Sequence, residues 1–284
     1  MVFSLESNAK INVGLNVTGV LPNGYHLLDM VMLPISLSDR LSGEIFDEVG
    51  ELTITTNKED IPTDERNILW KVYDRFYRES GLDRRKISVH LEKCIPHEAG
   101  LGGGSSNGAF FLKELNRYHN NFFPVPKLLE IGKSIGADIP FFIINRASRV
   151  RGIGEDIQEI ENNLTDDIII IKPNFGVSTA KAYKNMYMLN NKKDANIDNI
   201  ITGLRNNDIS LVEKSIENHL EQGLLLEDEN IIEFRKKVMG IPNMKFFMSG
   251  SGSAYYVFTK NGKQMVEFIK GQLQHCEVHL CRSL

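Results

Sequence analysis

The hydrophobic pattern at the start of the chain alternates with a period of two. Apolar side chains fall on one face of residues 9–17, and polar ones, including Lys10 and Asn12, fall on the other. This period is typical of a half-buried strand, which would point Lys10 and Asn12 in the same direction. A Pro-Asn-Gly turn follows, and Tyr25 and His26 come directly after it.

Further elements follow from the same kind of pattern. Apolar residues at helical spacing predict helices, whereas alternation or a short apolar run predicts a strand. The helices expected in this way cover 67–78, 109–118, 209–220 and 266–273, and the strands cover 87–91, 168–171, 246–248 and 254–258. Strands interleaved with helices in both halves predict two α/β or α+β units, which we place at 1–158 and 159–284.

Composition narrows the possible classes of protein. The 284 residues are 42% hydrophobic and 25% charged, which is usual for a globular protein. A net charge of −4 argues against a general nucleic-acid binder, although backbone N–H groups can still hold phosphate. We expect no signal peptide and no membrane partner, because no apolar run is long enough to cross a bilayer. Three cysteines without a CxxC pair indicate reduced thiols and a cytoplasmic location.

The strongest chemical signal is a glycine-rich loop between a predicted strand and a predicted helix. Residues 96–107 read PHEAGLGGGSSN. Glycines let the backbone fold around an anion, and a helix N-terminus adds free N–H groups and partial positive charge. Ser105 and Ser106 could cap the helix, bind phosphate oxygens, or do both. The loop matches neither the Walker pattern nor the dinucleotide fingerprint, and the chain has no HRD or DFG segment, so we expect another type of anion loop.

Other segments carry weaker signals when each is taken alone. Asp138, in the segment GADIPFF, could cap a helix, or it could deprotonate a hydroxyl from a partly desolvated position. Lys10 could be an ordinary solvated lysine. The Gly/Ser cluster at 249–253 could be a plain hairpin turn, and Arg151–Glu155 is also turn-like.

The order of these segments along the chain resembles the GHMP kinase superfamily. The matching segments are AKIN at 9–12, GYH at 24–26, the loop from Ile95 to Asn107, GADIPFF at 136–142, GIGE at 152–155, VSTA at 177–180 and MSGSG at 248–252. The resemblance implies an N-terminal domain like ribosomal protein S5 and a C-terminal ferredoxin-like domain. It implies transfer of the γ-phosphoryl group of ATP to a hydroxyl of a small metabolite. AKIN and GYH together resemble the members that act on methylerythritol linked to cytidine diphosphate, in non-mevalonate isoprenoid biosynthesis.

The resemblance also implies a role for individual residues. Asp138 would take or orient the acceptor proton, and Lys10 would stand close by and neutralise charge on the transferring phosphoryl group. The substrate would contact Asn12, Tyr25, His26 and Tyr183. The ATP phosphates would be held by Pro96, His97, Glu98, Ala99, Gly100, Leu101, Gly102, Gly103, Gly104, Ser105 and Ser106. Mg²⁺ would bridge the phosphates, with Ser106 as a protein contact.

Several positions depart from the family's pattern. Asn107 and Gly108 stand where Asp and Ala are usual, His97 and Glu98 where small or apolar residues are usual, and His219 where Asp is usual. A carboxylate near a triphosphate costs binding energy, so Glu98 predicts weakened ATP affinity. Two alternatives therefore accompany the kinase hypothesis: a nucleotide-binding homologue with little or no turnover, and a kinase for another alcohol such as mevalonate or homoserine. The Tyr25-His26 pair argues against the second.

Overall fold

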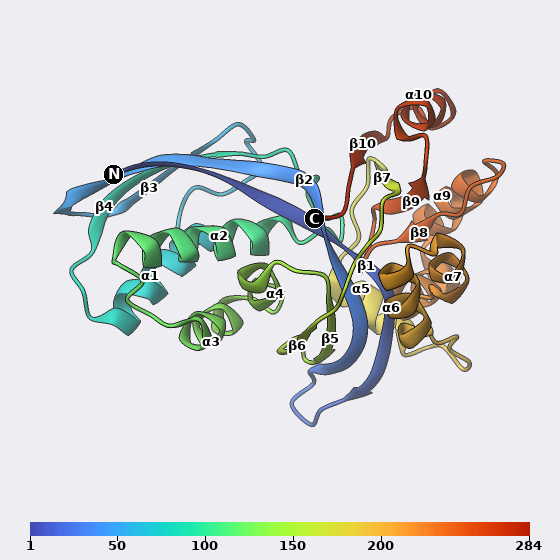
Figure 1. Ribbon diagram of the computed structural model, residues 1–284, viewed down its shortest axis with the longest axis horizontal. Helices are drawn as coiled ribbons and strands as arrows, with labels where there is room; N and C mark the ends of the chain where they lie inside the picture. Colours follow the sequence, from blue (N-terminus) through green and yellow to red (C-terminus); the bar gives the residue numbers. More distant parts are fainter. The chain divides into compact units, whose positions relative to one another are not determined.

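The chain is divided between two compact units, each assembled from three separate segments. The computed structural model describes residues 1–284 (Figure 1). The first unit comprises 1–9, 38–95 and 102–145, and the second comprises 10–37, 96–101 and 146–284. The long strands β1 (Val2–Val20) and β2 (His26–Val49) therefore supply residues to both units. The predicted boundary after residue 158 is a different division of the chain and stays a prediction.

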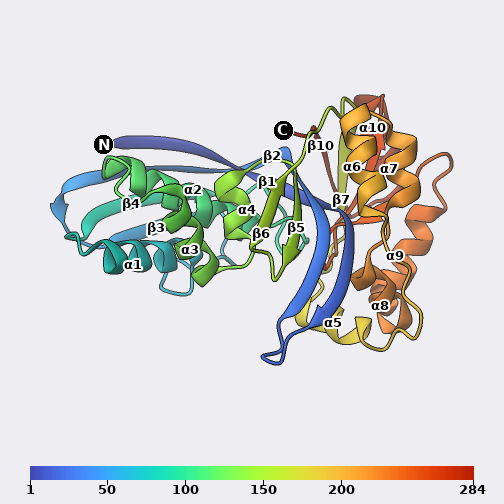
Figure 2. The same cartoon turned by 60° about the horizontal axis from the view of Figure 1, so that its bottom comes forward.

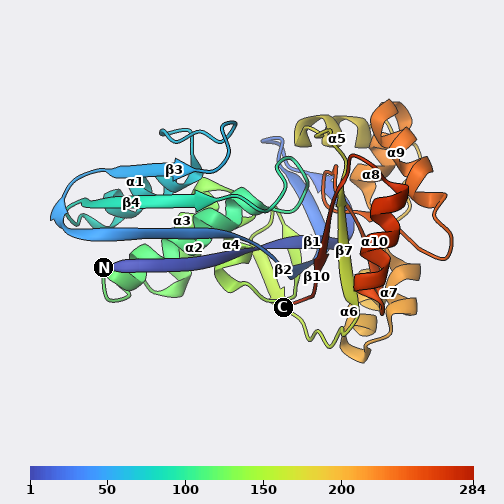
Figure 3. The same ribbon diagram turned by 90° about the horizontal axis from the view of Figure 1, so that it is seen from above.

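Helices cover one face of a sheet in the first unit. The far end of β2 pairs antiparallel with β4 (Arg85–Glu92), which pairs in parallel with β3 (Leu52–Thr56). Figures 1 and 3 show the four helices of this unit on one side of these strands. They are α1 (Ile68–Ser80), α2 (Gly103–Tyr118), α3 (Val125–Ile135) and α4 (Ile139–Ile144).

A four-stranded antiparallel sheet lies at the centre of the second unit. Its order is β10 (Glu277–Cys281), β7 (Asp167–Lys172), β9 (Tyr255–Thr259) and β8 (Phe247–Met248). The run Ile168–Ile171 is fully buried in β7, which explains why this strand reads as continuously apolar rather than alternating. Figure 3 shows α7, α8, α9 and α10 on one side of β7 and β10.

The remaining elements of the second unit complete it around this sheet. The beginning of β2 pairs antiparallel with β5 (Ser148–Gly152), which pairs with β6 (Asp156–Glu159). The helices are α5 (Thr179–Met186), α6 (Ile197–Asn206), α7 (Ile209–Ser215), α8 (His219–Glu227), α9 (Glu229–Met239) and α10 (Gly262–Gln272). Figure 2 shows α5 beside the turn that joins β1 to β2. No helix has the length and apolar character needed to span a membrane.

The predicted elements are confirmed, and several of their details need correction. β1 is buried on both faces from Ser7 to Val17, so it is not the half-buried strand that its alternation predicts. The helix expected over 209–220 is two helices, because the backbone is extended at Ile216 and Asn218 caps α8 by accepting from Leu220 N and Glu221 N. The helix near the C-terminus is followed by β10, which the apolar pattern did not reveal.

The helix after the glycine loop begins six residues earlier than expected. α2 starts at Gly103, and its N-cap is Gly102, whose φ of 71° lies in the left-handed region that favours glycine. Ser105 and Ser106 therefore lie inside the first turns of α2 and do not cap it. Of the two roles open to these serines, capping is excluded because Gly102 itself makes the turn, and phosphate binding stays a prediction.

Candidate active site

Lys10 and Asn12 form a buried polar pair on β1, in the second unit. The Lys10 ammonium donates hydrogen bonds to Asn12 Oδ1 at 2.6 Å and to the carbonyl oxygen of Gly100 at 2.9 Å. The backbone N–H of Lys10 donates to the carbonyl of Leu101 at 3.0 Å. The strand and the glycine loop are therefore joined through both the side chain and the backbone of Lys10, which is not an ordinary solvated lysine.

The loop residues of the second unit pack directly against the Gly/Ser cluster at 249–253. Ser249 Oγ donates to the Gly100 carbonyl at 3.0 Å, and the Asn12 N–H donates to the same hydroxyl at 3.3 Å. Gly100 has a φ of +71°, and a Cβ atom there would lie 2.0 Å from the carbonyl oxygen of Ser249. Gly250 also approaches Asn12 and Lys10 closely, since its Cβ would lie 2.9 Å from Asn12 Oδ1. This cluster is part of the loop's support and is more than a plain hairpin turn.

Glu98 is exposed, and its side chain lies against the backbone of Gly176. A Cβ atom on Gly176 would lie 2.1 Å from Glu98 Oε2. Burial lowers the pKa of Lys172, and the nearby Glu98 carboxylate opposes that shift. The Lys172 ammonium thus interacts electrostatically with the Glu98 carboxylate, the charge that was expected to weaken ATP binding. His97 is exposed as well, whereas Pro96, Ala99 and Leu101 are buried.

The N-terminus of α2, in the first unit, has the features of an anion site. Gly104 is exposed, and a Cβ atom there would meet nothing within 4 Å. The N–H groups of the first turn have no partner within the helix, and the helix dipole adds partial positive charge. Gly102, Gly103, Gly104 and Ser105 are therefore at the position where phosphate oxygens would bind.

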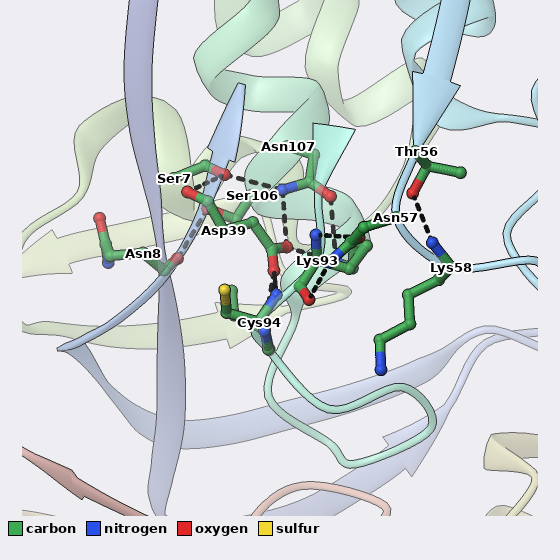
Figure 4. A network of polar contacts seen from close by, with 11 residues as sticks. Ser7, Asn8, Asp39, Thr56, Asn57, Lys58, Lys93, Cys94, Ser106 and Asn107 are labelled. Atoms are coloured by element: carbon green, nitrogen blue, oxygen red, sulfur yellow. Dashed lines mark hydrogen bonds and ion pairs between the residues drawn. The ribbon is translucent and has the colours of Figure 1, made fainter. Parts of the chain in front are cut away.

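Ser106, the residue expected to contact Mg²⁺, has its hydroxyl engaged within the first unit. It is fully buried, and its hydroxyl donates to the carbonyl oxygen of Asn8 at 2.6 Å inside the first unit (Figure 4). The contact between Ser106 and Mg²⁺ stays a prediction. Elsewhere, no cluster of three or more His, Cys, Asp or Glu side chains could hold a metal ion.

Asp138 precedes α4 in the first unit, with Pro140 at the start of that helix. It occupies the N-cap position, but its side chain makes no capping hydrogen bond to the helix. The alternative of a plain cap thus lacks its defining contact. The catalytic role expected for Asp138 stays a prediction at this point.

An aromatic stack joins the start of β2 to α5 in the second unit. The rings of His26 and Tyr183 are parallel within 3°, with centroids 3.9 Å apart. Burial lowers the pKa of His26 and raises that of Tyr187, so the imidazole is neutral and the phenol protonated near neutral pH. Tyr187 O–H can then donate to His26 Nδ1, which leaves a proton on Nε2. Tyr25 is 57% exposed on the adjoining turn and takes no part in this stack.

Tyr187 and Ser249 are the candidate residues that the sequence did not single out. Tyr187 follows α5 directly and contacts His26 across 161 positions of sequence. Ser249 belongs to a segment that was noticed for its glycines, but its contact with Gly100 spans 149 positions. No local pattern reports contacts of this kind.

Comparisons with known proteins agree with this geometry. The domain family "GHMP kinases N terminal domain" matches residues 67–146, which include the glycine loop and Asp138. A Fusobacterium nucleatum protein named 4-diphosphocytidyl-2-C-methyl-D-erythritol kinase is 44% identical over 99% of this chain and 97% of its own length. A Clostridium acetobutylicum protein of the same name is 33% identical over 99% of this chain and 100% of its own length.

Solved structures give the same result. A crystal structure of 4-(cytidine 5'-diphospho)-2C-methyl-D-erythritol kinase matches with a TM-score of 0.79 and 25% identity, covering 98% of this chain and 99% of its own. A homoserine kinase from Cytophaga hutchinsonii matches with a TM-score of 0.74 at 18% identity, over 99% of this chain and 95% of its own, and shows likeness of fold alone.

Proposed function

This chain belongs to the 4-diphosphocytidyl-2-C-methyl-D-erythritol kinases of the GHMP kinase superfamily, and on that premise we propose that it transfers the γ-phosphoryl group of ATP to the 2-hydroxyl of that cytidine-linked polyol. The observation that carries the proposal is the 44% identity over nearly the whole of both chains. The fold is the α+β GHMP kinase fold. We also propose a cytoplasmic location, because three cysteines without a CxxC pair are typical of reduced thiols.

The cytidine end of the substrate binds beside the β1–β2 turn in this proposal. His26 presents Nε2–H as a donor, because its Nδ1 accepts the hydrogen bond from Tyr187 O–H. An acceptor atom on the edge of cytosine suits this donor. Tyr183 and the exposed Tyr25 offer aromatic faces for the base. Asn12 contacts the hydroxyl or phosphate groups farther along the substrate.

Phosphoryl transfer depends mainly on positioning and electrostatic stabilisation. The loop from Pro96 to Ser105 and the N-terminus of α2 hold the ATP phosphates through backbone N–H groups. Lys10 neutralises charge on the transferring group, and Asp138 accepts the proton of the acceptor hydroxyl. Mg²⁺, bound together with ATP, would supply charge neutralisation at the phosphates, and it commonly takes most of its ligands from nucleotide phosphates and water.

Turnover with a panel of acceptors tests the proposal. We expect ADP release from ATP with 4-diphosphocytidyl-2-C-methyl-D-erythritol and none with mevalonate or homoserine. A folded protein that binds the cytidine substrate without phosphorylating it would instead be a binding homologue, and the kinase proposal would fail.

The role of Asp138 is tested separately. Asp138→Asn should lower kcat far more than it lowers substrate affinity, because it removes the proton acceptor and keeps the shape. Asp208→Asn is the matched control, since Asp208 does cap its helix, α7, by accepting from Leu211 N at 3.1 Å. A wild-type kcat in Asp138→Asn would refute the catalytic role.

A further inference from the structure

One buried carboxylate in the first unit accepts hydrogen bonds from two separate segments of the chain. Asp39, in β2, is fully buried. Its Oδ1 accepts from the backbone N–H groups of Cys94 at 2.7 Å and Ile95 at 2.8 Å. Its Oδ2 forms an ion pair with the Lys93 ammonium and accepts from Asn107 Nδ2 at 2.9 Å. Figure 4 shows Asp39 beside Lys93, Cys94 and Asn107.

These partners are the two points at which the glycine loop is attached to the first unit. The chain leaves that unit after Ile95 and returns at Gly102. Asn107 is the fifth residue of α2, so it lies just beyond the point of return. The Lys93 ammonium also donates to Asn107 Oδ1 at 3.2 Å, which closes the connection between the two ends.

The cost of this arrangement indicates a role beyond packing. Removing a carboxylate and an ammonium from water is expensive, and apolar residues of similar volume often stabilise a core as well or better. What a buried ionic network adds is a fixed geometry, since each member has directional partners. Here the geometry that is fixed is the spacing between the two ends of the loop.

We propose that Asp39 is a positioning residue for ATP: it holds the two ends of the phosphate-binding loop at the separation at which the first-turn N–H groups of α2 meet the phosphates. The inference rests on the proposed kinase function. Asp39 does not touch the nucleotide in this proposal. It acts through Cys94 and Ile95 on one side and through Asn107 on the other.

Asparagine cannot replace the carboxylate at this position. Asp39 accepts hydrogen bonds at both oxygens, whereas an amide has one oxygen and one nitrogen donor. If the oxygen of the introduced amide faced Cys94 and Ile95, its nitrogen would face the donors of Lys93 and Asn107. With the amide reversed, the nitrogen would face two backbone N–H groups. Either orientation breaks the hydrogen bonds of residue 39 to one end of the loop.

Steady-state kinetics of Asp39→Asn test the proposal. We expect the KM for ATP to rise about tenfold or more, while kcat at saturating ATP stays within about threefold and the Kd for the cytidine substrate without ATP is unchanged. A purely structural residue would not separate these quantities. An ATP KM within about twofold of wild type would overturn the inference even if the protein were less stable.

A control variant and a second variant make the result specific. Asn116→Ala removes a buried side chain near the other end of α2, where Asn116 bonds the Phe123 N–H at 2.8 Å and carbonyl at 3.0 Å. It should lower stability without raising the ATP KM, and an equal rise there would overturn the inference. If Asp39→Asn fails to fold, Asn107→Ala is the second variant, because it removes, of the contacts of Asp39, only the one with α2. It should still raise the KM for ATP. An unchanged KM for ATP in Asn107→Ala would show that the inference is wrong. If the wild-type protein itself showed no turnover, the proposed function would be wrong, and that result is distinct from an unchanged KM in the variants.

Discussion

The positive charge of Lys10 lies at the junction of a strand and a loop. Its ammonium donates to Gly100 O at 2.9 Å and to Asn12 Oδ1 at 2.6 Å, and Gly250 leaves room for both side chains. These contacts fix the ammonium relative to the backbone. Groups held in advance stabilise developing charge better than groups that must reorganise, so this arrangement suits a lysine that acts on a transferring phosphoryl group.

Replacing Lys10 with methionine should therefore affect turnover more than binding. We expect Lys10→Met to lower kcat by at least about 100-fold, which corresponds to about 2.7 kcal/mol of transition-state stabilisation. Asn16→Ala is a matched control, because Asn16 is buried on the same strand and bonds the Ala195 N–H at 2.8 Å and carbonyl at 2.9 Å. That variant should lose stability and keep its kcat, as thermal melts and ADP-release assays would show. A kcat within about tenfold of wild type in Lys10→Met would contradict the role.

Residue type and chain order were enough to select Lys10, Asn12 and the loop as candidates, and their roles stay predictions. The loop stood out because glycines before a helix carry a local physical meaning. The same analysis could not place Asp39 or Tyr187. Asp39 contacts Ile95 across 56 positions of sequence, and no spacing rule connects two such residues. Burial of the polar face of β1 was missed for the same reason, because the alternation describes one strand and not what covers it.

At the scale of the element, two neighbouring glycines at the start of α2 are glycine for different physical reasons. A Cβ on Gly103 would lie 3.0 Å from Ile95 Cγ2, so close packing against the segment that follows β4 favours glycine there. A Cβ on Gly104 would meet nothing within 4 Å. Glycine favours a helix less than alanine does, so Gly104, in the first turn of α2, adds nothing to the helix and is unexplained by packing. Close approach of a ligand to the backbone accounts for it.

Gly104→Ala should thus change stability and binding in opposite directions. We expect a small rise in Tm, of about 2 °C or less, because alanine favours the helix even near its start. The KM for ATP should rise about tenfold, because the methyl group would occupy space needed by phosphate oxygens. Gly271→Ala in α10 is the control, since a Cβ there also meets nothing within 4 Å. It should raise Tm without changing the KM, and an unchanged KM in Gly104→Ala would show that phosphates bind elsewhere.

The contact between β1 and α8 depends on a histidine that must remain neutral. His219, at the start of α8, is 2% exposed, and its Nδ1 accepts from the Val17 N–H at 3.0 Å. Burial lowers the pKa of His219; the Asp194 carboxylate, whose Oδ1 lies 2.9 Å from Nε2, opposes that shift, and Lys192 adds to it. Protonation of Nδ1 would remove the acceptor and place a charge among buried groups.

Stability should therefore fall in mildly acidic solution. The unfolded state binds a proton at His219 near the ordinary pKa of about 6.5, whereas the folded state binds it only at lower pH. The stabilisation is present above about pH 6.5 and is lost as the pH falls below that value. Urea unfolding near neutral pH and about two pH units lower should show this loss, and His219→Asn should show less of it, since Asn Oδ1 can accept from Val17 without titrating. Equal pH dependence in both proteins would mean that other groups cause it.

At the scale of the whole molecule, the two units are interleaved along the chain. Residues 10–37 belong to the second unit, although most of the chain between them and 146–284 belongs to the first. Several contacts attach this early segment to the late one: Tyr256 O–H donates to Asn12 O at 3.0 Å, and Leu15 N–H donates to Glu217 O at 2.9 Å. A sequence-based boundary assumes continuous domains, so it could not predict this arrangement.

The interleaving predicts that residues 159–284 do not fold stably alone. This fragment keeps the sheet of β7, β8, β9 and β10 but loses β1, and with it the hydrogen bonds at Tyr256, His219 and Ala195. Buried polar groups without partners cost about 1–3 kcal/mol each, a large share of the stability of a typical domain. We expect poor amide dispersion and no cooperative urea transition, and we expect added peptide 10–37 to restore near-UV circular dichroism. A cooperative transition in the fragment alone would instead support the continuous domain 159–284.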